Sequence, residues 1–352
     1  MKTGVELIKE LSLIPAPSGE EARVADAIEA ELSGLSVSLT RDRLGNLIAH
    51  KQGPVGAPRV LVSAHMDEVG FIVTEITKEG YLRFANVGGI DPRVLCGRAV
   101  TLLGKEGDLS GVIIAKGIHL QNKEEREKMP TADDFSIDIG TDSREESEKL
   151  VEIGTEGTFD SDFTLLGANG EYVACKALDD RMGCAAMIEM LRELEGKELP
   201  VDLYMAFTVR EEIGLTGAKT VAQNLSPDFS IVLETTAIAD LPDVPAHRRV
   251  ADVGSGGVLS LCDNGTVYDR AFVDFALALA GSEKIPAQVK RFVSGGNDAA
   301  KIQRTGVGVR CLALSLATRY LHAPCSVASL ADYESVKALV LSLFAHWNEG
   351  GF

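Results

Sequence analysis

The sequence predicts an α/β fold: a mixed, largely parallel sheet with helices on both faces, interrupted by an inserted small all-β domain. Two observations lead to this prediction. At both ends of the chain, helical patterns of apolar residues alternate with short apolar runs that are typical of buried strands. Between them, residues 71–167 are rich in glycine, short β-type runs and charged turns. We therefore expect a discontinuous α/β domain of residues 1–70 and 168–352, and a β-barrel-like domain at 71–167.

The elements near the N-terminus follow from periodicity and turn signals. Apolar residues recur at helical spacing through residues 5–14, where two prolines end the run. Ser18 and Glu21 have the spacing of a capping box, which predicts that a second helix starts there. Short β-type runs then predict strands at 37–39, 46–50 and 59–64.

Regular alternation of helices and strands returns after residue 172. Apolar runs predict strands at 201–209, 229–234, 287–292 and 308–314. Amphipathic patterns predict helices at 180–195, 217–224, 269–281, 298–303 and 331–347. Alternation of this kind is typical of a largely parallel sheet that helices cover on both faces.

The bulk composition narrows the class of protein. The chain has 352 residues and a net charge of −17, which argues against nucleic acid or an anionic membrane as a partner. No apolar run is long enough to span a bilayer, and the N-terminus lacks the pattern of a signal peptide. Six well-separated cysteines form no C-x-x-C motif, so neither a disulfide framework nor a zinc knuckle is expected. We expect a cytoplasmic protein.

Acidic and histidine side chains follow several of the predicted strands. In a parallel α/β sheet, the carboxyl ends of the strands meet at one edge, and functional groups collect there. The residues at these ends are His65, Asp67, Asp179, Asp180, Glu211, Glu212, Glu234 and His322. The sequence therefore predicts a dense cluster of carboxylates and imidazoles at one edge of the sheet.

Each of these residues also has a structural interpretation. Asp179 and Asp180 could cap the helix that follows them, and Glu211 with Glu212 could be a solvated pair on a loop. Isolated histidines at strand ends or turns are often structural. Together, however, so many like charges require compensation, and divalent cations provide it. Histidine and carboxylate are ligands that zinc, cobalt and manganese accept.

The spacing of His65 and Asp67 suggests a supporting role for the aspartate. Residues i and i+2 of a strand share a face, so Asp67 could accept the far imidazole N–H of His65 and fix its tautomer. Two histidines and at least three carboxylates exceed the needs of one ion. This surplus suits two metal ions that share one bridging carboxylate.

Five motifs resemble one known family. HMDEVG, ALDDRMG, VREEIGLTGA, SGGNDA and TRYLHAP, in this order and with the inserted β segment, resemble the dinuclear metalloaminopeptidases of peptidase family M42. The resemblance covers nearly the whole chain. It implies that His65, Asp179 and Glu234 hold one ion, and that Asp179, Glu212 and His322 hold the other. Asp179 would bridge the two ions, which are expected to be zinc or cobalt.

The resemblance also implies the roles of the remaining residues. Asp67 would orient His65, and Glu211 would act as general base and acid in hydrolysis of the N-terminal peptide bond of a peptide substrate. Many members have aspartate where this chain has Glu234, so a different rotamer or monodentate binding would be needed there. The Asp179–Asp180 peptide is expected to be strained and able to adopt the cis form.

The family resemblance extends to assembly and to the pocket. The inserted domain is similar to a dimerisation domain, from which dimers assemble into hollow tetrahedral dodecamers. Residues 294–302 are expected to form part of the pocket wall, although a glycine-rich turn before a helix is an equal interpretation. Acidic and large aliphatic N-terminal residues both remain open as preferred substrates.

Other functions are weaker interpretations of the same residues. A glycosidase such as an endoglucanase needs two carboxylates but neither metal nor paired histidines, and aromatic residues make up only 5% of the chain. A non-catalytic paralogue does not explain why every expected catalytic position is occupied. A deacylase or dipeptidase would use the same two-metal chemistry and remains an alternative.

Overall fold

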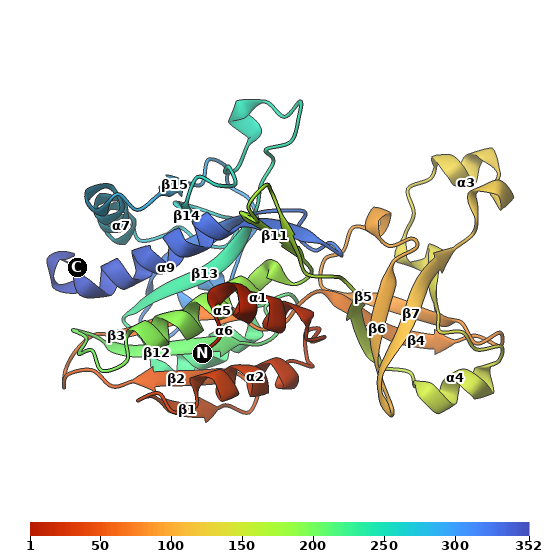
Figure 1. Ribbon diagram of the computed structural model, residues 1–352, viewed down its shortest axis with the longest axis horizontal. Helices are drawn as coiled ribbons and strands as arrows, with labels where there is room; N and C mark the ends of the chain where they lie inside the picture. The colour runs from red at the N-terminus through yellow and green to blue at the C-terminus, as the bar shows by residue number, and fades with distance from the viewer. Residues whose placement is uncertain (352) are drawn as a thin grey trace.

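The computed structural model describes residues 1–351, which form an α/β lobe and a smaller β lobe side by side (Figure 1). The large sheet has the strand order β1-β2-β12-β3-β13-β16-β17-β11-β10, with β14 and β15 attached beside β16. Its central neighbours β12, β3, β13 and β16 are parallel, and antiparallel strands continue the sheet at both sides. The strands are β1 (Ser38–Arg41), β2 (Leu47–Lys51), β3 (Arg59–His65), β10 (Thr164–Leu166), β11 (Tyr172–Cys175), β12 (Asp202–Thr208), β13 (Phe229–Ala237), β14 (Gly257–Leu259), β15 (Ala287–Val289), β16 (Arg310–Arg319) and β17 (Ser326–Ser329).

Helices cover both faces of this sheet because successive crossovers move in opposite directions along the strand order. The connection from β3 to β12 passes through α5, and the connection from β12 back to β13 passes through α6. Since such crossovers are right-handed, α5 and α6 are placed on opposite faces, which confirms the predicted fold class. The helices of this lobe are α1 (Gly4–Leu13), α2 (Ala22–Leu32), α5 (Leu178–Glu193), α6 (Thr216–Leu225), α7 (Arg270–Glu283), α8 (Ala299–Ile302) and α9 (Leu330–Ala345).

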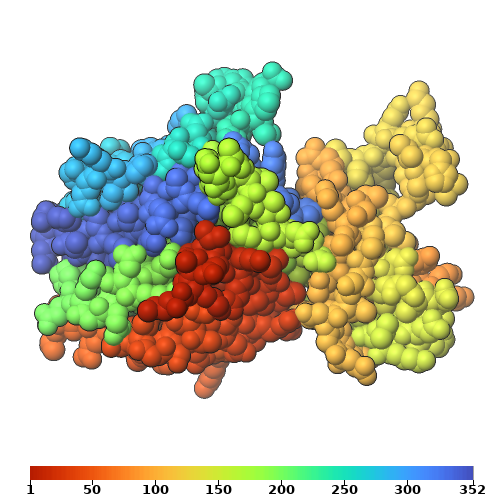
Figure 2. Space-filling model, viewed as in Figure 1, coloured from red at the N-terminus to blue at the C-terminus, as the bar shows by residue number. Residues whose placement is uncertain are grey.

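The smaller lobe is a closed antiparallel barrel with the strand order β4-β5-β8-β7-β6-β9. Its strands are β4 (Gly70–Ile76), β5 (Leu82–Val87), β6 (Ala99–Gly104), β7 (Gly107–Ala115), β8 (Phe135–Asp138) and β9 (Glu156–Phe159), with α3 (Lys123–Glu127) and α4 (Arg144–Leu150) outside. Phe71 lies at the centre of a separate core and contacts Phe84 and Phe159 edge to face. The predicted all-β insertion is thus confirmed as a barrel, which projects from one end of the α/β lobe (Figure 2).

A buried ionic network joins the two lobes at Glu68. One carboxylate oxygen accepts hydrogen bonds from Lys176 Nζ at 2.6 Å and from the backbone N–H of Ala16 at 3.1 Å. The other oxygen accepts a bond from Thr158 Oγ1 of the barrel at 2.7 Å. Arg181 Nη2 lies 3.7 Å from the same carboxylate. Glu68 therefore fixes the barrel against the α/β lobe directly beside the carboxyl end of β3.

Several local predictions were wrong. Ser18 and Glu21 form no capping box: Ser18 donates its hydroxyl to Asp67 instead, at 2.6 Å, and Glu21 makes no side-chain cap. At this end of the chain a capping box is found instead at α1, between Thr3 and Glu6. Strands β14 and β17 were not predicted, and β10 pairs with β11 in the large sheet. No helix within residues 1–351 has the length and hydrophobicity needed to cross a bilayer.

Candidate metal centre

The carboxyl ends of the parallel strands place the predicted residues together. His65 is the last residue of β3 and pairs in register with Thr208, just before the turn that carries Glu211 and Glu212. Glu234 lies within β13, the neighbour of β3 on its other side. Asp179 comes from the start of α5, and His322 follows β16. All the predicted ligands therefore reach one edge of the sheet from five separate segments.

Asp179 lies between two groups of donors. Its Oδ1 is 3.3 Å from His65 Nε2, and its Oδ2 is 3.5 Å from His322 Nε2. His65 Nε2 is also 3.5 Å from Glu234 Oε1, and His322 Nε2 is 3.2 Å from Glu212 Oε2. The structure thus forms two three-residue groups, each with donor atoms within 4.8 Å of one another, and both contain Asp179.

A third group includes Glu211. His65, Glu211 and Glu212 also place one donor atom each within 4.8 Å of one another. Unlike Glu212, which faces His322, the Glu211 carboxylate makes no hydrogen bond or ion pair within residues 1–351. The two neighbouring glutamates therefore have different surroundings.

Asp67 holds the turn that carries both glutamates. Its Oδ1 accepts the backbone N–H of Glu211 at 3.0 Å, and its Oδ2 accepts that of Glu212 at 3.1 Å. His65 Nδ1 lies 3.5 Å from Asp67 Oδ1 but only 3.1 Å from the Asp67 backbone carbonyl. The sequence predicted that the Asp67 carboxylate accepts the imidazole N–H of His65, whereas the nearer oxygen is the Asp67 backbone carbonyl. The role of the carboxylate in fixing residues 211 and 212 was not foreseen.

Burial shifts the pKa of the acids in this cluster. Burial raises the pKa of Glu234 well above its ordinary value, and the charge of Asp179 adds to the effect. Burial likewise raises the pKa of Glu211, with further contributions from Asp298 and Glu212. Since each carboxylate is surrounded by others, the cluster favours a bound cation or a proton.

The pKa values of the two histidines are also raised, but here burial opposes the shift and contacts with carboxylates cause it. Burial lowers the pKa of His322, but its contacts with Asp179 and Glu212 outweigh this and raise it to about 11. For His65, burial is likewise outweighed, chiefly by Glu234 and Asp179, and the pKa lies well above its ordinary value. The positive charge of the protonated imidazoles balances the nearby carboxylates. A bound divalent cation would supply that positive charge instead, with the histidines as neutral ligands.

The donor set fits divalent cations. Within residues 1–351, neither Asp179, Glu212 nor Glu234 forms an ion pair with a lysine or an arginine. Two imidazoles and three buried carboxylates without such a partner are the ligands that borderline divalent metals accept. The cluster could therefore hold a metal.

The backbone at Asp179 and Asp180 separates the roles of these two residues. The peptide bond between them is cis. Asp180 Oδ1 accepts the backbone N–H of Gly183 at 3.1 Å, in the manner of a helix cap. Asp179 makes no such bond and faces the histidines. The capping interpretation thus applies to Asp180, and Asp179 is left for the cluster.

A cavity of about 410 Å³ opens onto the cluster. The predicted wall segment contributes Ser294, Gly295, Gly296 and Asn297 to it. Other lining residues were not singled out from the sequence, because only tertiary contacts bring them there. They are Thr235, Thr236, Ala237, Lys290, Ser315 and Leu321.

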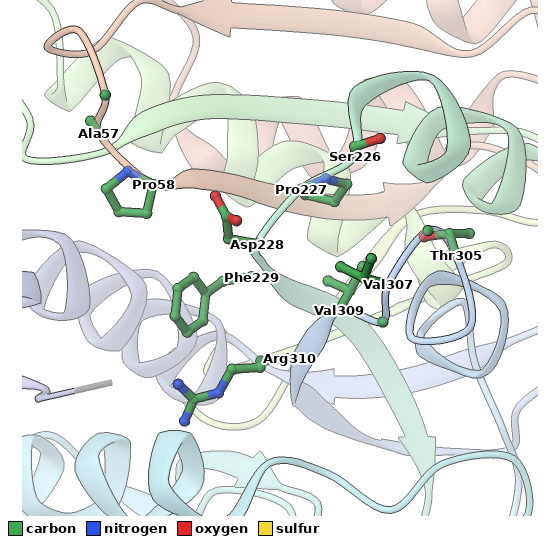
Figure 3. A pocket seen from close by; sticks show the side chains of 13 residues that line it. Ala57, Pro58, Ser226, Pro227, Asp228, Phe229, Thr305, Val307, Val309 and Arg310 are labelled. Atoms are coloured by element: carbon green, nitrogen blue, oxygen red, sulfur yellow. The ribbon is translucent and has the colours of Figure 1, made fainter.

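A second cavity, of about 570 Å³, lies at the amino ends of β13 and β16 (Figure 3). Its charged lining residues are Asp228 and Arg310, and both are engaged. Asp228 accepts the backbone N–H of Arg59 at 2.9 Å, and Arg310 pairs with Asp269 at 2.7 Å. Unlike the first cavity, this one has no cluster of histidines and acids.

Comparison with known proteins identifies the class to which this two-lobed protein belongs. The model of the M42 glutamyl aminopeptidase family matches residues 45–339. The chain belongs to the M42 family of peptidases, which confirms the resemblance of its five motifs. It is therefore an enzyme of the aminopeptidase class.

Curated relatives and solved structures agree with this assignment. The chain is 34% identical to the lysyl aminopeptidase of Pyrococcus furiosus, over 96% of each chain. It is 29% identical to the glutamyl aminopeptidase of Lactococcus lactis, over 97% of this chain and 96% of the relative. The crystal structure of a TET aminopeptidase from a Thaumarchaeota archaeon superposes with a TM-score of 0.94 at 34% identity, covering 97% and 95% of the two chains. The Pyrococcus horikoshii TET1 peptidase, which assembles into a tetrahedron or a large octahedral shell, has a TM-score of 0.86 at 36% identity, covering 97% and 99%.

Proposed function

We propose that the protein is a metal-dependent aminopeptidase that removes the N-terminal residue of peptides at a dinuclear centre. The observation that carries this proposal is the position of Asp179, whose two carboxylate oxygens face different histidines. A carboxylate so placed is suited to bridge two ions. The excess of carboxylates at the site also suits the free α-amino group of a peptide, which carries a positive charge when protonated.

The residues divide into two ligand sets around this bridge. His65 and Glu234 would hold one ion together with Asp179, and Glu212 and His322 would hold the other. Zinc and cobalt suit such mixed imidazole and carboxylate ligands. When bound, such ions supply Lewis acidity, which lowers the pKa of water and polarises a carbonyl group. Glu234 can join the first ligand set although many family members have aspartate there, since its Oε1 lies close to His65 Nε2.

Glu211 is proposed as the general base and acid. Its carboxylate lines the cavity without a protein partner, and burial raises its pKa well above the ordinary value of a glutamate. A raised pKa favours the return of a proton after it has been accepted. Glu211 would take a proton from the attacking water and return it to the leaving amine. Asp67 supports this role because it holds the backbone N–H of Glu211 and of Glu212. The two side chains are thereby kept in their different positions.

The barrel is proposed as the dimerisation and assembly domain. Large apolar side chains are exposed on this lobe and offer surface that a partner could cover. They include Val112, Ile118, Leu120, Met129 and Ile153. The TET1 relative forms closed shells from similar chains, and dimers that assemble into a dodecamer are the arrangement we propose here.

Substitution of Glu211 by glutamine tests the proposed mechanism. Glu211→Gln keeps the shape of the side chain but removes the proton carrier, so turnover of aminoacyl-p-nitroanilides should fall about 10²- to 10⁴-fold. Metal content should change little. The matched control is Glu212→Gln, which should instead weaken metal binding, because Glu212 faces His322. Unchanged turnover in metal-loaded Glu211→Gln would contradict the assignment.

The choice of substrates separates aminopeptidase activity from related reactions. Peptides with a free N-terminus should be shortened from that end in the presence of zinc or cobalt. N-acetylated amino acids and dipeptides form the comparison set. If only N-acetylated amino acids or only dipeptides were hydrolysed, the site would belong to a deacylase or a dipeptidase with the same metal chemistry.

A further inference from the structure

Lys290 brings a positive charge to the cavity beside the metal centre. It directly follows β15, and its backbone N–H donates to the carbonyl of Leu259 at 2.9 Å, which fixes its position. Its side chain lines the same cavity as Glu211, Glu212 and Glu234. No other lysine or arginine lines this cavity within residues 1–351. The wall of the cavity thus carries a single basic side chain.

The ammonium group of Lys290 has no carboxylate partner. Its Nζ donates one hydrogen bond, to the backbone carbonyl of Ser294 at 2.7 Å, and it forms no ion pair within residues 1–351. An ammonium has three donors, so two are left for water or a ligand. Burial lowers the pKa of Lys290, although the charges of Asp263 and Glu234 act in the opposite direction. A half-buried cation of this kind is stabilised when an anion binds beside it.

The nearby Asp263 does not provide that partner. Its Oδ1 accepts the backbone N–H groups of Gly265 and Thr266, each at 2.7 Å, and its Oδ2 accepts the hydroxyl of Tyr268. Both carboxylate oxygens of Asp263 are thereby engaged by hydrogen bonds within residues 263–268. The positive charge of Lys290 remains available to whatever fills the cavity.

The other walls of the cavity are polar and leave room for a side chain. Thr235 has a buried hydroxyl with no hydrogen-bond partner within residues 1–351. On the facing segment, Gly295 and Gly296 have open space where a Cβ would lie. An aliphatic side chain in the cavity would leave the Lys290 ammonium without an ionic partner, and a basic side chain would be repelled. A carboxylate would give the Lys290 ammonium an ionic partner.

We propose that Lys290 pairs with the side-chain carboxylate of the substrate's N-terminal residue, so that the enzyme prefers glutamyl and aspartyl peptides. This inference rests on the proposed aminopeptidase function. The names of relatives do not decide the preference, since both lysyl and glutamyl aminopeptidases are similar to this chain over nearly its full length. The deciding feature is the unpaired cation in the cavity.

A comparison of glutamyl and glutaminyl substrates tests this role. The two side chains have nearly the same shape and differ in charge, so the ratio of their kcat/KM values isolates the effect of Lys290. For the wild-type enzyme with zinc or cobalt, Glu-p-nitroanilide should exceed Gln-p-nitroanilide by about 10- to 100-fold, the size of a charge-assisted hydrogen bond. Lys290→Met should reduce this ratio to about 1, whereas Lys290→Arg should retain most of it, because it preserves the charge.

A surface lysine provides the matched control. Lys219 lies exposed on α6 and does not line the cavity, so Lys219→Met should leave the ratio unchanged. Faster hydrolysis of Leu- or Lys-p-nitroanilide than of the glutamyl substrate by the wild type would overturn the role of Lys290 and leave the aminopeptidase function intact. So would an unchanged ratio in Lys290→Met. If no substrate were hydrolysed with either metal, the proposed function itself would fail.

Discussion

Replacement of Glu68 by leucine should strongly destabilise the junction between the two lobes. Glu68 and Lys176 are each 3% exposed, and Arg181 is fully buried, so the ionic network around Glu68 is shielded from water. Leucine is apolar and one atom shorter than glutamate, and it accepts no hydrogen bond. The variant therefore leaves the charge of Lys176 without a partner. The hydroxyl of Thr158 and the N–H of Ala16 also lose their present acceptor.

The expected cost follows from the loss of one partner in a buried ion pair. Such losses destabilise by about 3–5 kcal/mol, because the remaining charge is buried without compensation. Removal of the unpaired Lys176 charge should restore part of the lost stability. In a double-mutant cycle, Glu68→Leu/Lys176→Met should be more stable than the sum of the single variants by about 1–3 kcal/mol.

Urea unfolding measures this effect. With a slope of about 2–3 kcal/mol per molar urea, a loss of about 4 kcal/mol moves the midpoint by about 1.3–2 M. Protein concentration must be fixed, since assembly contributes to stability. The control is Arg23→Gln, which breaks an exposed ion pair with Asp108 between the same two lobes and should cost less than about 1 kcal/mol. A loss below about 1 kcal/mol in Glu68→Leu would refute the reasoning.

Two further predictions concern the same junction. Burial, together with the charge of Glu20, raises the pKa of Glu156 from 4.5 to about 7. The stability that protonated Glu156 provides is fully present below pH 4.5 and is lost as the pH rises through about 7. Glu156→Gln should therefore match the wild type at pH 4 and be more stable at pH 8, by about 1 kcal/mol after allowance for solvent screening; a larger difference at pH 4 would contradict this. A Cβ at Gly70 would lie 2.4 Å from the backbone oxygen of Gly157, so Gly70→Ala should lower the melting temperature. In contrast, Gly281→Ala in α7 meets open space and should raise it, and equal effects of the two alanine variants would count against the steric argument.

Much of the fold could be predicted from sequence because its pattern is local. Alternation of apolar runs and helical periods indicated the α/β lobe, and close-spaced β-type runs indicated the barrel. The predicted capping box at Ser18 and Glu21 failed for a non-local reason. The Ser18 hydroxyl is taken by Asp67, which lies far away in sequence. The spacing of residues could not reveal this competition.

The same distinction applies to the site. Strand ends identified the acidic residues and His65, since parallel strands end at one edge. The pairing of Glu212 with His322 depends on how the turn after β16 folds back over the sheet, which no periodicity encodes. The position of Lys290 in the cavity could not be predicted from the sequence for the same reason. It lies outside every motif, and only the packing of β15 beside β14 brings it to the cavity.

Metal titration of the EDTA-treated protein tests the central claim most directly. Bound metal per chain and hydrolysis of peptides with a free N-terminus are measured together as zinc or cobalt is added. The ligand sets around Asp179 predict two ions per chain, with activity absent after EDTA treatment and restored as the ions bind. Full aminopeptidase activity in metal-free protein, or saturation at a single ion, would contradict the dinuclear centre.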